Sequence, residues 1–240
     1  MSNASAISED VGLSSAYPVE SVLGGVLIGL ATGALMISSA GVAGNSGALR
    51  ALIKGTGETS KQMFVLGLVA AGVISGAATP WAYQATYEDA SWPLTVVGGL
   101  LVGAGTVLQN GCTSGHGLAG LSRLSLRSAI ATPIFMLFAI FSAIAKSGFA
   151  AGPPAPLADT PSEHLTAGLA FAGGAAALLA SLALAWRSQS GEQGDVRAYA
   201  GFVSGSIFGL GLALGGMVRP STVTAALSLT RWDPTLWILL

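Results

Sequence analysis

The amino-acid sequence predicts an all-α membrane protein, a multi-pass helical bundle with internal repeats and with broken or re-entrant short helices that meet near the membrane centre. Three observations support this prediction. Hydrophobic residues make up 52% of the chain and charged residues only 9%, whereas a soluble domain carries about 25% charged residues. Several uncharged apolar runs reach the length of about 20 residues that crosses a bilayer. Glycine accounts for 34 residues, which favours closely packed or interrupted helices.

The same composition excludes several classes of protein. It does not fit a disordered chain, a secreted miniprotein held by disulfides or an ordinary soluble enzyme. The net charge of −1 gives no electrostatic basis for binding nucleic acid. We expect a polar tail over residues 1–18, which lacks the basic segment of a cleavable signal peptide. A single transmembrane transport domain is expected over residues 19–240, and it should continue beyond Leu240, where an apolar run stops.

Six charge-free stretches define the expected membrane crossings. They span residues 21–49, 62–87, 91–122, 128–145, 165–186 and 198–218. The first and the third are too long for one crossing, because the third alone would form a helix of about 48 Å against a hydrocarbon core of about 30 Å. We therefore expect a helix break within residues 41–47 and another within residues 110–117, where glycine and asparagine favour turns.

The basic residues predict the orientation of the chain. Seven of the ten fall in the first, third and fifth expected loops, whereas the second and fourth loops carry only acidic charges. Because cytoplasmic loops are enriched in Lys and Arg, the N-terminus is expected outside. The residues expected on the cytoplasmic side are Arg50, Lys54, Lys61, Arg123, Arg127, Arg187 and Arg197.

A weak internal repeat, Gly-x-Leu/Ile-x-Gly, occurs three times, and each copy precedes a polar or Gly/Pro-interrupted segment. The copies begin at Gly25, Gly99 and Gly205, and the interruptions contain Asn45, Cys112 and Pro220. One copy alone is typical of helix packing. Three copies, each followed by an interruption, indicate broken helices around a transport pathway, and we expect the interruptions to converge.

Side chains with distinctive chemistry concentrate in the second interruption, where one thiol, two hydroxyls and one imidazole lie within five residues. Non-helical backbone at membrane depth is tolerated where it lines a cavity. A short helix that starts near Ser114 would also direct free N–H groups towards an anion beside Cys112. A small anion with oxygen atoms and a soft sulfur end suits these donors. The candidate substrate-binding residues are Asn45, Ser46, Asn110, Cys112, Thr113, Ser114, Gly115, His116 and Gly117.

The same residues have less specific interpretations. Cys112 can be a small apolar filler, and His116 can be only an interfacial hydrogen-bonding residue. A Cys–His nucleophilic pair requires both side chains on one face of a helical turn, and the glycines on either side of His116 argue against such a turn. With one cysteine and two histidines in the chain, we expect no metal site and no cofactor.

Residues 111–117 (Gly-Cys-Thr-Ser-Gly-His-Gly), followed by residues 120–128 (Gly-Leu-Ser-Arg-Leu-Ser-Leu-Arg-Ser), resemble the signature of the YeeE/YedE sulfur-transport family. Residues 211–220 resemble its second half, so the likeness covers most of the chain from Leu23 onward. The resemblance implies a multi-pass inner- or plasma-membrane protein that passes thiosulfate along cysteines at a narrow waist. This chain retains one such cysteine, Cys112. Hydroxyls stand in the first repeat at Ser38 and Ser39, and the family's later Cys-Pro segment is expected after Leu240.

The sequence therefore favours a membrane permease, and not an enzyme, for thiosulfate or a related small sulfur-containing anion. The lipid bilayer is its expected surroundings, and a cytoplasmic sulfur carrier is a candidate partner. Two alternatives stay open. One is a membrane-embedded thiol protein that uses Cys112 covalently, and the other is a non-transporting fragment of the family.

Overall fold

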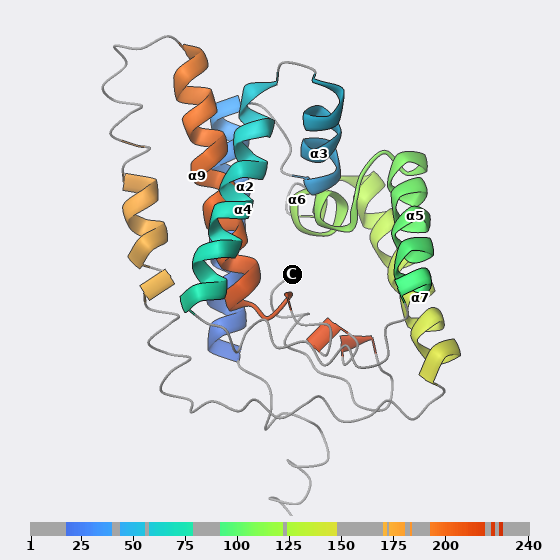
Figure 1. Ribbon diagram of the computed structural model, residues 1–240. Coiled ribbons are helices and arrows are strands. Elements are labelled where there is room, and N and C mark those ends of the chain that lie inside the picture. Colours follow the sequence, from blue (N-terminus) through green and yellow to red (C-terminus); the bar gives the residue numbers. More distant parts are fainter. Residues whose placement is uncertain are drawn as a thin grey trace, which may run out of the picture.

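The computed structural model describes residues 18–39, 44–55, 58–78, 92–121, 124–147 and 193–218, together with parts of 170–183 and 222–227. Every regular element in these ranges is a helix, which confirms the predicted all-α class (Figure 1). The labelled helices are α2 (Pro18–Ser39), α3 (Asn45–Lys54), α4 (Thr59–Ala78), α5 (Trp92–Leu108), η3 (Ser114–Leu118), α6 (Ala119–Leu121), α7 (Leu126–Ser147) and α9 (Gln193–Leu214).

Three of these helices are long and apolar enough to cross a membrane, namely Val19–Ser38, Thr59–Ala78 and Asp195–Leu214. Two shorter apolar helices, Thr95–Leu108 and Leu126–Ser142, occupy the third and fourth expected crossings. The fifth expected crossing is only partly described, and most of the predicted N-terminal tail and the segment after residue 227 lie outside the described residues. The helices thus support a membrane protein, while the number of crossings stays a prediction.

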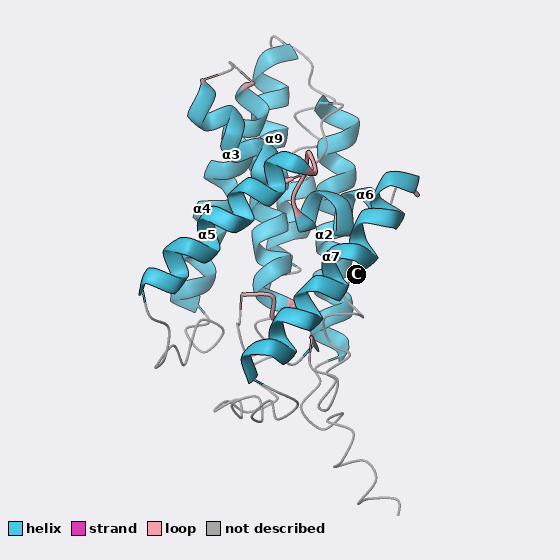
Figure 2. Ribbon diagram, turned by 90° about the vertical axis from the view of Figure 1, so that its right-hand side faces the viewer, coloured by secondary structure: helices cyan, strands magenta, loops and turns pink. Residues whose placement is uncertain are grey.

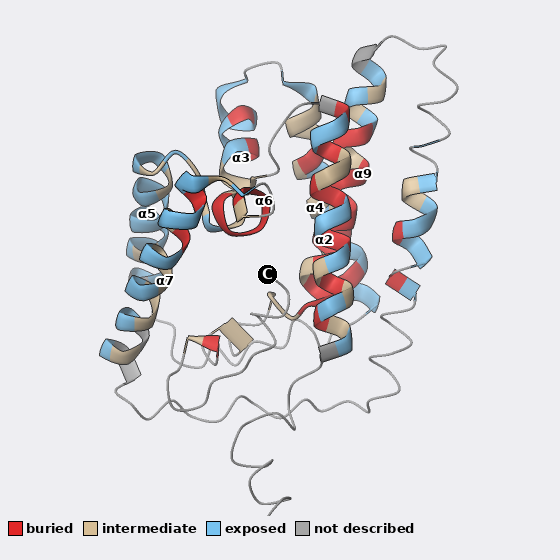
Figure 3. Cartoon of the chain, turned by 180° about the vertical axis from the view of Figure 1, so that it is seen from behind, coloured by how far each residue is buried: buried red, intermediate tan, exposed pale blue. Residues whose placement is uncertain are grey.

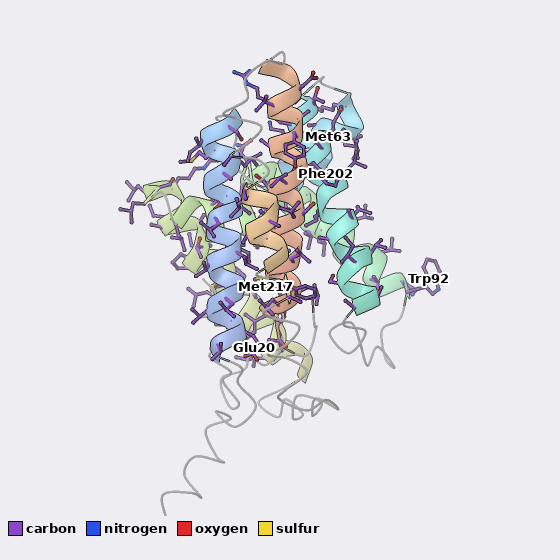
Figure 4. The ribbon with its side chains drawn as sticks, turned by 90° about the vertical axis from the view of Figure 1, so that its left-hand side faces the viewer. Glu20, Met63, Trp92, Phe202 and Met217 are labelled. Atoms are coloured by element: carbon purple, nitrogen blue, oxygen red, sulfur yellow. The ribbon has the colours of Figure 1, made fainter. Side chains whose placement is uncertain are left out.

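The core of the molecule is a bundle in which α9 packs against both α2 and α4 (Figures 1 and 3). Phe64 of α4 and Phe208 of α9 are almost completely buried, and their rings meet edge to face with centroids 5.7 Å apart. The helix α4 runs parallel to α9, and α2 runs antiparallel to it. In Figure 4, Met63 and Phe202 accordingly lie towards one end of the bundle, and Glu20 and Met217 lie towards the other.

Close approach of the three helices depends on glycine. A methyl group added at Gly67 of α4 would collide with the carbonyl group of Phe202. One added at Gly24 of α2 would lie 2.8 Å from the carbonyl oxygen of Gly211, closer than real Cβ contacts. Small residues let membrane helices bring their backbones together, so these positions explain part of the high glycine content.

The repeated glycine pattern does not have one packing role. Gly205 and Gly209 of α9 lie against α4, whereas a methyl group at Gly99 or Gly103 of α5 would have no neighbour within 4 Å among the described residues. What the copies share is the helix end that follows each of them. The pattern therefore predicted the positions of the breaks and not the contacts of the glycines.

The helices α5 and α9 end in the same type of cap. After α5, Asn110 adopts a left-handed conformation with φ of 55°, and the N–H of Gly111 donates to the carbonyl of Thr106 at 3.0 Å. After α9, Gly216 takes the left-handed conformation with φ of 72°, and the following N–H makes the equivalent hydrogen bond at 3.0 Å. Such caps satisfy carbonyl groups at a helix end. The first break lies between Ser39, where α2 ends, and Asn45, where α3 begins.

The second break lies within the predicted residues 110–117, and a short helix starts at Ser114, the position considered from the sequence. Helical backbone resumes directly after Cys112, first as the π-helix η3 and then as α6, and the N–H of His116 donates to the carbonyl of Cys112 at 2.9 Å. The expectation that the glycines beside His116 prevent a helical turn is therefore wrong. A glycine costs a helix only about 1 kcal/mol, whereas each buried backbone group left without a partner costs about 1–3 kcal/mol.

Candidate functional site

The first and second helix breaks meet, as the repeat predicts. A methyl group built at Gly44, just before α3, would lie 3.6 Å from the Cα atom of Gly115 and 3.9 Å from the Sγ atom of Cys112. Figures 1 and 2 show α3 and α6 in the same half of the molecule, and Figure 1 shows them between the α2–α4–α9 bundle and the α5–α7 pair. Met217, from the turn after α9, lines a cavity that also reaches Cys112, while Pro220 lies outside the described residues.

The thiol of Cys112 is surrounded by polar groups from both breaks. Its Sγ atom lies 3.0 Å from the Oγ atom of Ser114. The hydroxyl and backbone of Ser46 and the backbone of Gly115 also lie near the thiol. Since Ser46 belongs to α3 and Ser114 to η3, the two short helices together form the surroundings of the sulfur atom. An apolar filler would lie among hydrocarbon side chains, so this environment argues against that interpretation.

The side chain of His116 packs against the backbone of the turn to which it belongs. Its side chain is buried, and its Nδ1 atom lies 3.3 Å from the carbonyl oxygen of Cys112. The ring occupies the space beside Gly111, where an added methyl group would lie 2.6 Å from Nδ1. Within the described residues the ring nitrogens make no hydrogen bond to the thiol. The geometry therefore gives His116 an orienting role and offers no Cys–His nucleophilic pair.

A basic cavity of about 660 Å³ lies on one side of the Cys112 turn. Arg50 and Lys54 of α3, Lys61 of α4 and Arg127 of α7 line it, against the single carboxylate of Glu58 in the same lining. Glu58 forms an ion pair with Lys61, so the lining carries a net excess of positive charge. Clustered charge of one sign in a cleft raises the local concentration of the opposite ion. This cavity is therefore suited to attract small anions.

An apolar cavity of about 440 Å³ lies on the other side of the same turn. Its walls come mainly from large apolar side chains of α7, α9 and the segment after α9, including Phe135, Met136, Phe208, Leu212 and Met217. Polar groups enter this lining from Asn45, Cys112, Thr113, Ser114 and Thr132. The two cavities thus differ in chemistry although they belong to one site.

Cys112 is the residue that the linings of the two cavities share. The other predicted site residues divide between them. Ser46, Asn110, Gly115 and His116 face the basic cavity, and Asn45, Thr113, Ser114 and Gly117 face the apolar one. All nine predicted residues are therefore brought together around one thiol, and Asn110 has the additional role of capping α5.

The sequence did not assign the basic side chains to the site. The distribution of basic residues marks only the cytoplasmic side of the chain, yet four of them line one cavity, namely Arg50, Lys54, Lys61 and Arg127. Arg197, near the start of α9, lies towards the same end of the bundle, and Arg123 and Arg187 lie outside the described residues. A usable signal was present, because Arg50 and Lys54 follow closely after the first predicted break and Arg127 follows the second. Thr132, inside the mainly apolar helix α7, gave no signal of its own.

Comparisons with known proteins agree with this site. The sulphur transport family matches residues 9–141, more than half of the chain. A protein named "Probable transporter" from Xylella fastidiosa strain 9a5c is 40% identical over 121 residues, which cover 50% of this chain and 87% of that protein. Its counterpart from strain Temecula1 has the same identity and coverage. No solved structure matches the fold.

Proposed function

Because the chain belongs to the sulphur transport family, we propose that it is a membrane permease for thiosulfate or a related small sulfur-containing anion. Transport of a sulfur compound across a membrane is the broad activity of the protein. The proposal that the substrate is a sulfur-containing anion such as thiosulfate rests on the position of Cys112. This residue is the one common to the linings of the basic and the apolar cavity. An anion that moves between these cavities would pass the thiol.

The basic cavity supports the charge of the proposed substrate. Thiosulfate is a dianion, and the side chains of Arg50, Lys54, Lys61 and Arg127 would concentrate it next to the Cys112 turn. In the predicted orientation this cavity opens towards the cytoplasm. The proposed cytoplasmic sulfur carrier would then collect the anion at this end.

The surroundings of Cys112 support the chemical identity of the substrate. The thiol can contact the terminal sulfur of thiosulfate, while the hydroxyls of Ser114 and Ser46 and the N–H of Gly115 lie close enough to hold its oxygen atoms. Hydroxyl and N–H donors alone would suit sulfate equally well. The thiol adds a contact for sulfur, and it therefore favours an anion that presents both sulfur and oxygen.

Uptake of labelled thiosulfate by cells that express the full-length protein tests this function. Cys112→Ala should lower uptake about tenfold or more at an unchanged protein level, and Cys112→Ser should not restore it, because a hydroxyl is smaller and more strongly hydrated than a thiol. His116→Ala should have a smaller effect. The matched control is Ser142→Ala on α7, whose hydroxyl bonds the carbonyl of Phe138 and faces neither cavity. Normal uptake by Cys112→Ala would contradict the proposal.

A covalent role for Cys112 is the alternative, and the mass of Cys112 together with the release of sulfite separates it from simple passage. The thiolate would attack the terminal sulfur of thiosulfate, break the sulfur–sulfur bond and release sulfite, which leaves a persulfide on the cysteine. The exposure of Cys112 to two cavities makes this attack sterically feasible. A mass increase of one sulfur atom on Cys112, together with sulfite release at the rate of uptake, would favour the covalent route over simple passage.

A further inference from the structure

Two polar atoms in the apolar cavity lack hydrogen-bond partners. The Oγ1 atom of Thr132 and the Oδ1 atom of Asn45 are both buried, and neither has a partner among the residues that the structure describes. Thr132 comes from α7 and Asn45 from the start of α3, and both residues line the cavity that holds Cys112. A third unpartnered atom, the hydroxyl oxygen of Ser204, belongs to neither of the two cavity linings.

The Thr132 hydroxyl departs from a pattern that several other buried helical hydroxyls follow, and the Ser204 hydroxyl, outside both cavities, departs from it as well. Thr32 donates to the carbonyl of Gly29 at 2.9 Å, and Ser38 donates to the carbonyl of Ala34 at 2.7 Å. A carbonyl group in the preceding turn is the usual hydrogen-bond partner of a hydroxyl inside a helix. Thr132 is only 6% exposed but makes no such bond. A buried hydroxyl without a partner destabilises the ligand-free protein, because the desolvation of its polar atom is not compensated, and a ligand in the cavity would supply the missing partner.

The composition of the cavity indicates what kind of ligand fits. An anion that leaves water for this cavity exchanges its hydration shell for walls such as Phe135 and Phe208, and it therefore needs hydrogen-bond donors there. The Thr132 hydroxyl can donate one hydrogen bond. The Asn45 side chain can donate another if its amide group is turned, since the oxygen and nitrogen positions of an amide are interchangeable assignments.

We propose that Thr132 and Asn45 form an oxygen-binding position in the apolar cavity, whose lining also includes Cys112. The position binds the oxygen atoms of a sulfur oxyanion while the thiol contacts its terminal sulfur. This proposal rests on the proposed permease function and narrows the substrate class. It selects anions that carry oxygen, such as thiosulfate, over hydrosulfide, which presents sulfur but no oxygen acceptor.

Thiosulfate binding to the purified full-length protein, measured by calorimetry together with the melting temperature, tests this position. Thr132→Val keeps the shape of the side chain and removes the hydroxyl. It should weaken thiosulfate binding about tenfold, the effect of losing one hydrogen bond to a charged group. The melting temperature of the ligand-free protein should stay the same or rise, because the hydroxyl has no partner to lose. Thr132→Ser should bind within about twofold of the unmodified protein.

The matched control is Thr32→Val on α2, which makes the same chemical change at a buried helical threonine whose hydroxyl is already paired. It should leave thiosulfate affinity unchanged. If Thr132→Val binds thiosulfate as tightly as the unmodified protein, the oxygen-binding position is wrong, and a trapped water is the simpler partner of the hydroxyl. If that variant also transports normally while Cys112→Ala does not, the permease function stands without this position. If the unmodified protein binds no thiosulfate, both proposals fail.

Discussion

The two cavities that meet at Cys112 have similar access to the thiol but opposite chemistry. The basic cavity is lined by charged groups from α3, α4 and α7, whereas the apolar cavity is lined by aromatic and aliphatic side chains with a few uncharged polar groups. Charge attracts an anion over distance but distinguishes poorly between anions of equal charge. Isolated hydrogen-bond donors in apolar surroundings distinguish strongly between anions, because any donor that an anion leaves unpaired weakens its binding. In the proposed permease, the basic side would gather anions and the apolar side would select among them.

The strongest test of this comparison is to displace the turn between the cavities. A methyl group at Gly111 would collide with the ring of His116, whose contact with the Cys112 carbonyl helps to hold the turn. Gly111→Ala should therefore lower thiosulfate uptake about tenfold or more, since small displacements of a positioning group have large effects on function. Uptake normalised to the amount of protein in the membrane is the measurement.

The matched control for that change is Gly72→Ala in α4, where an added methyl group has no neighbour within 4 Å. It should transport normally. Equal uptake by the two alanine variants would mean that the position of His116 does not matter to the site.

A smaller effect is expected when charge is removed from the basic cavity. Replacing Arg50 and Lys54 together by glutamine should raise the KM for thiosulfate about three- to tenfold with little change in the maximal rate, because these side chains gather the anion and do not contact it at the thiol. The difference should shrink as ionic strength rises and screens the remaining charges. Initial uptake rates over a range of thiosulfate and salt concentrations provide the check.

Arg197→Gln is the control for long-range charge. Arg197 is exposed near the start of α9 and lies outside both cavity linings. The Arg197→Gln substitution should leave the KM for thiosulfate unchanged. A KM shift as large as that of the double variant would mean that general surface charge, and not the cavity, attracts the anion.

Sequence reasoning located the parts of this site better than it described their contacts. The excess length of two charge-free stretches was enough to predict the breaks before Asn45 and after Leu108, because a single straight helix cannot fit so many residues into the bilayer. The short helix near Ser114 agrees with the sequence analysis. The expectation that glycine prevents a helical turn between Cys112 and His116 failed, because it gave too little weight to the requirement that buried backbone groups be paired. The role of Thr132 could not be predicted, since it depends on which atoms of other helices lie within reach of its hydroxyl.

The two-sided exposure of Cys112 is the central claim, and the chain offers a direct way to test it. Cys112 is the only cysteine in residues 1–240, so replacing any further cysteine of the full-length protein by alanine makes Cys112 the single labelling site. A membrane-impermeant thiol reagent should label it in right-side-out and in inside-out vesicles, and thiosulfate should slow labelling from both sides. Labelling from neither side, or labelling that thiosulfate does not slow, would contradict a pathway that passes the thiol between the two cavities.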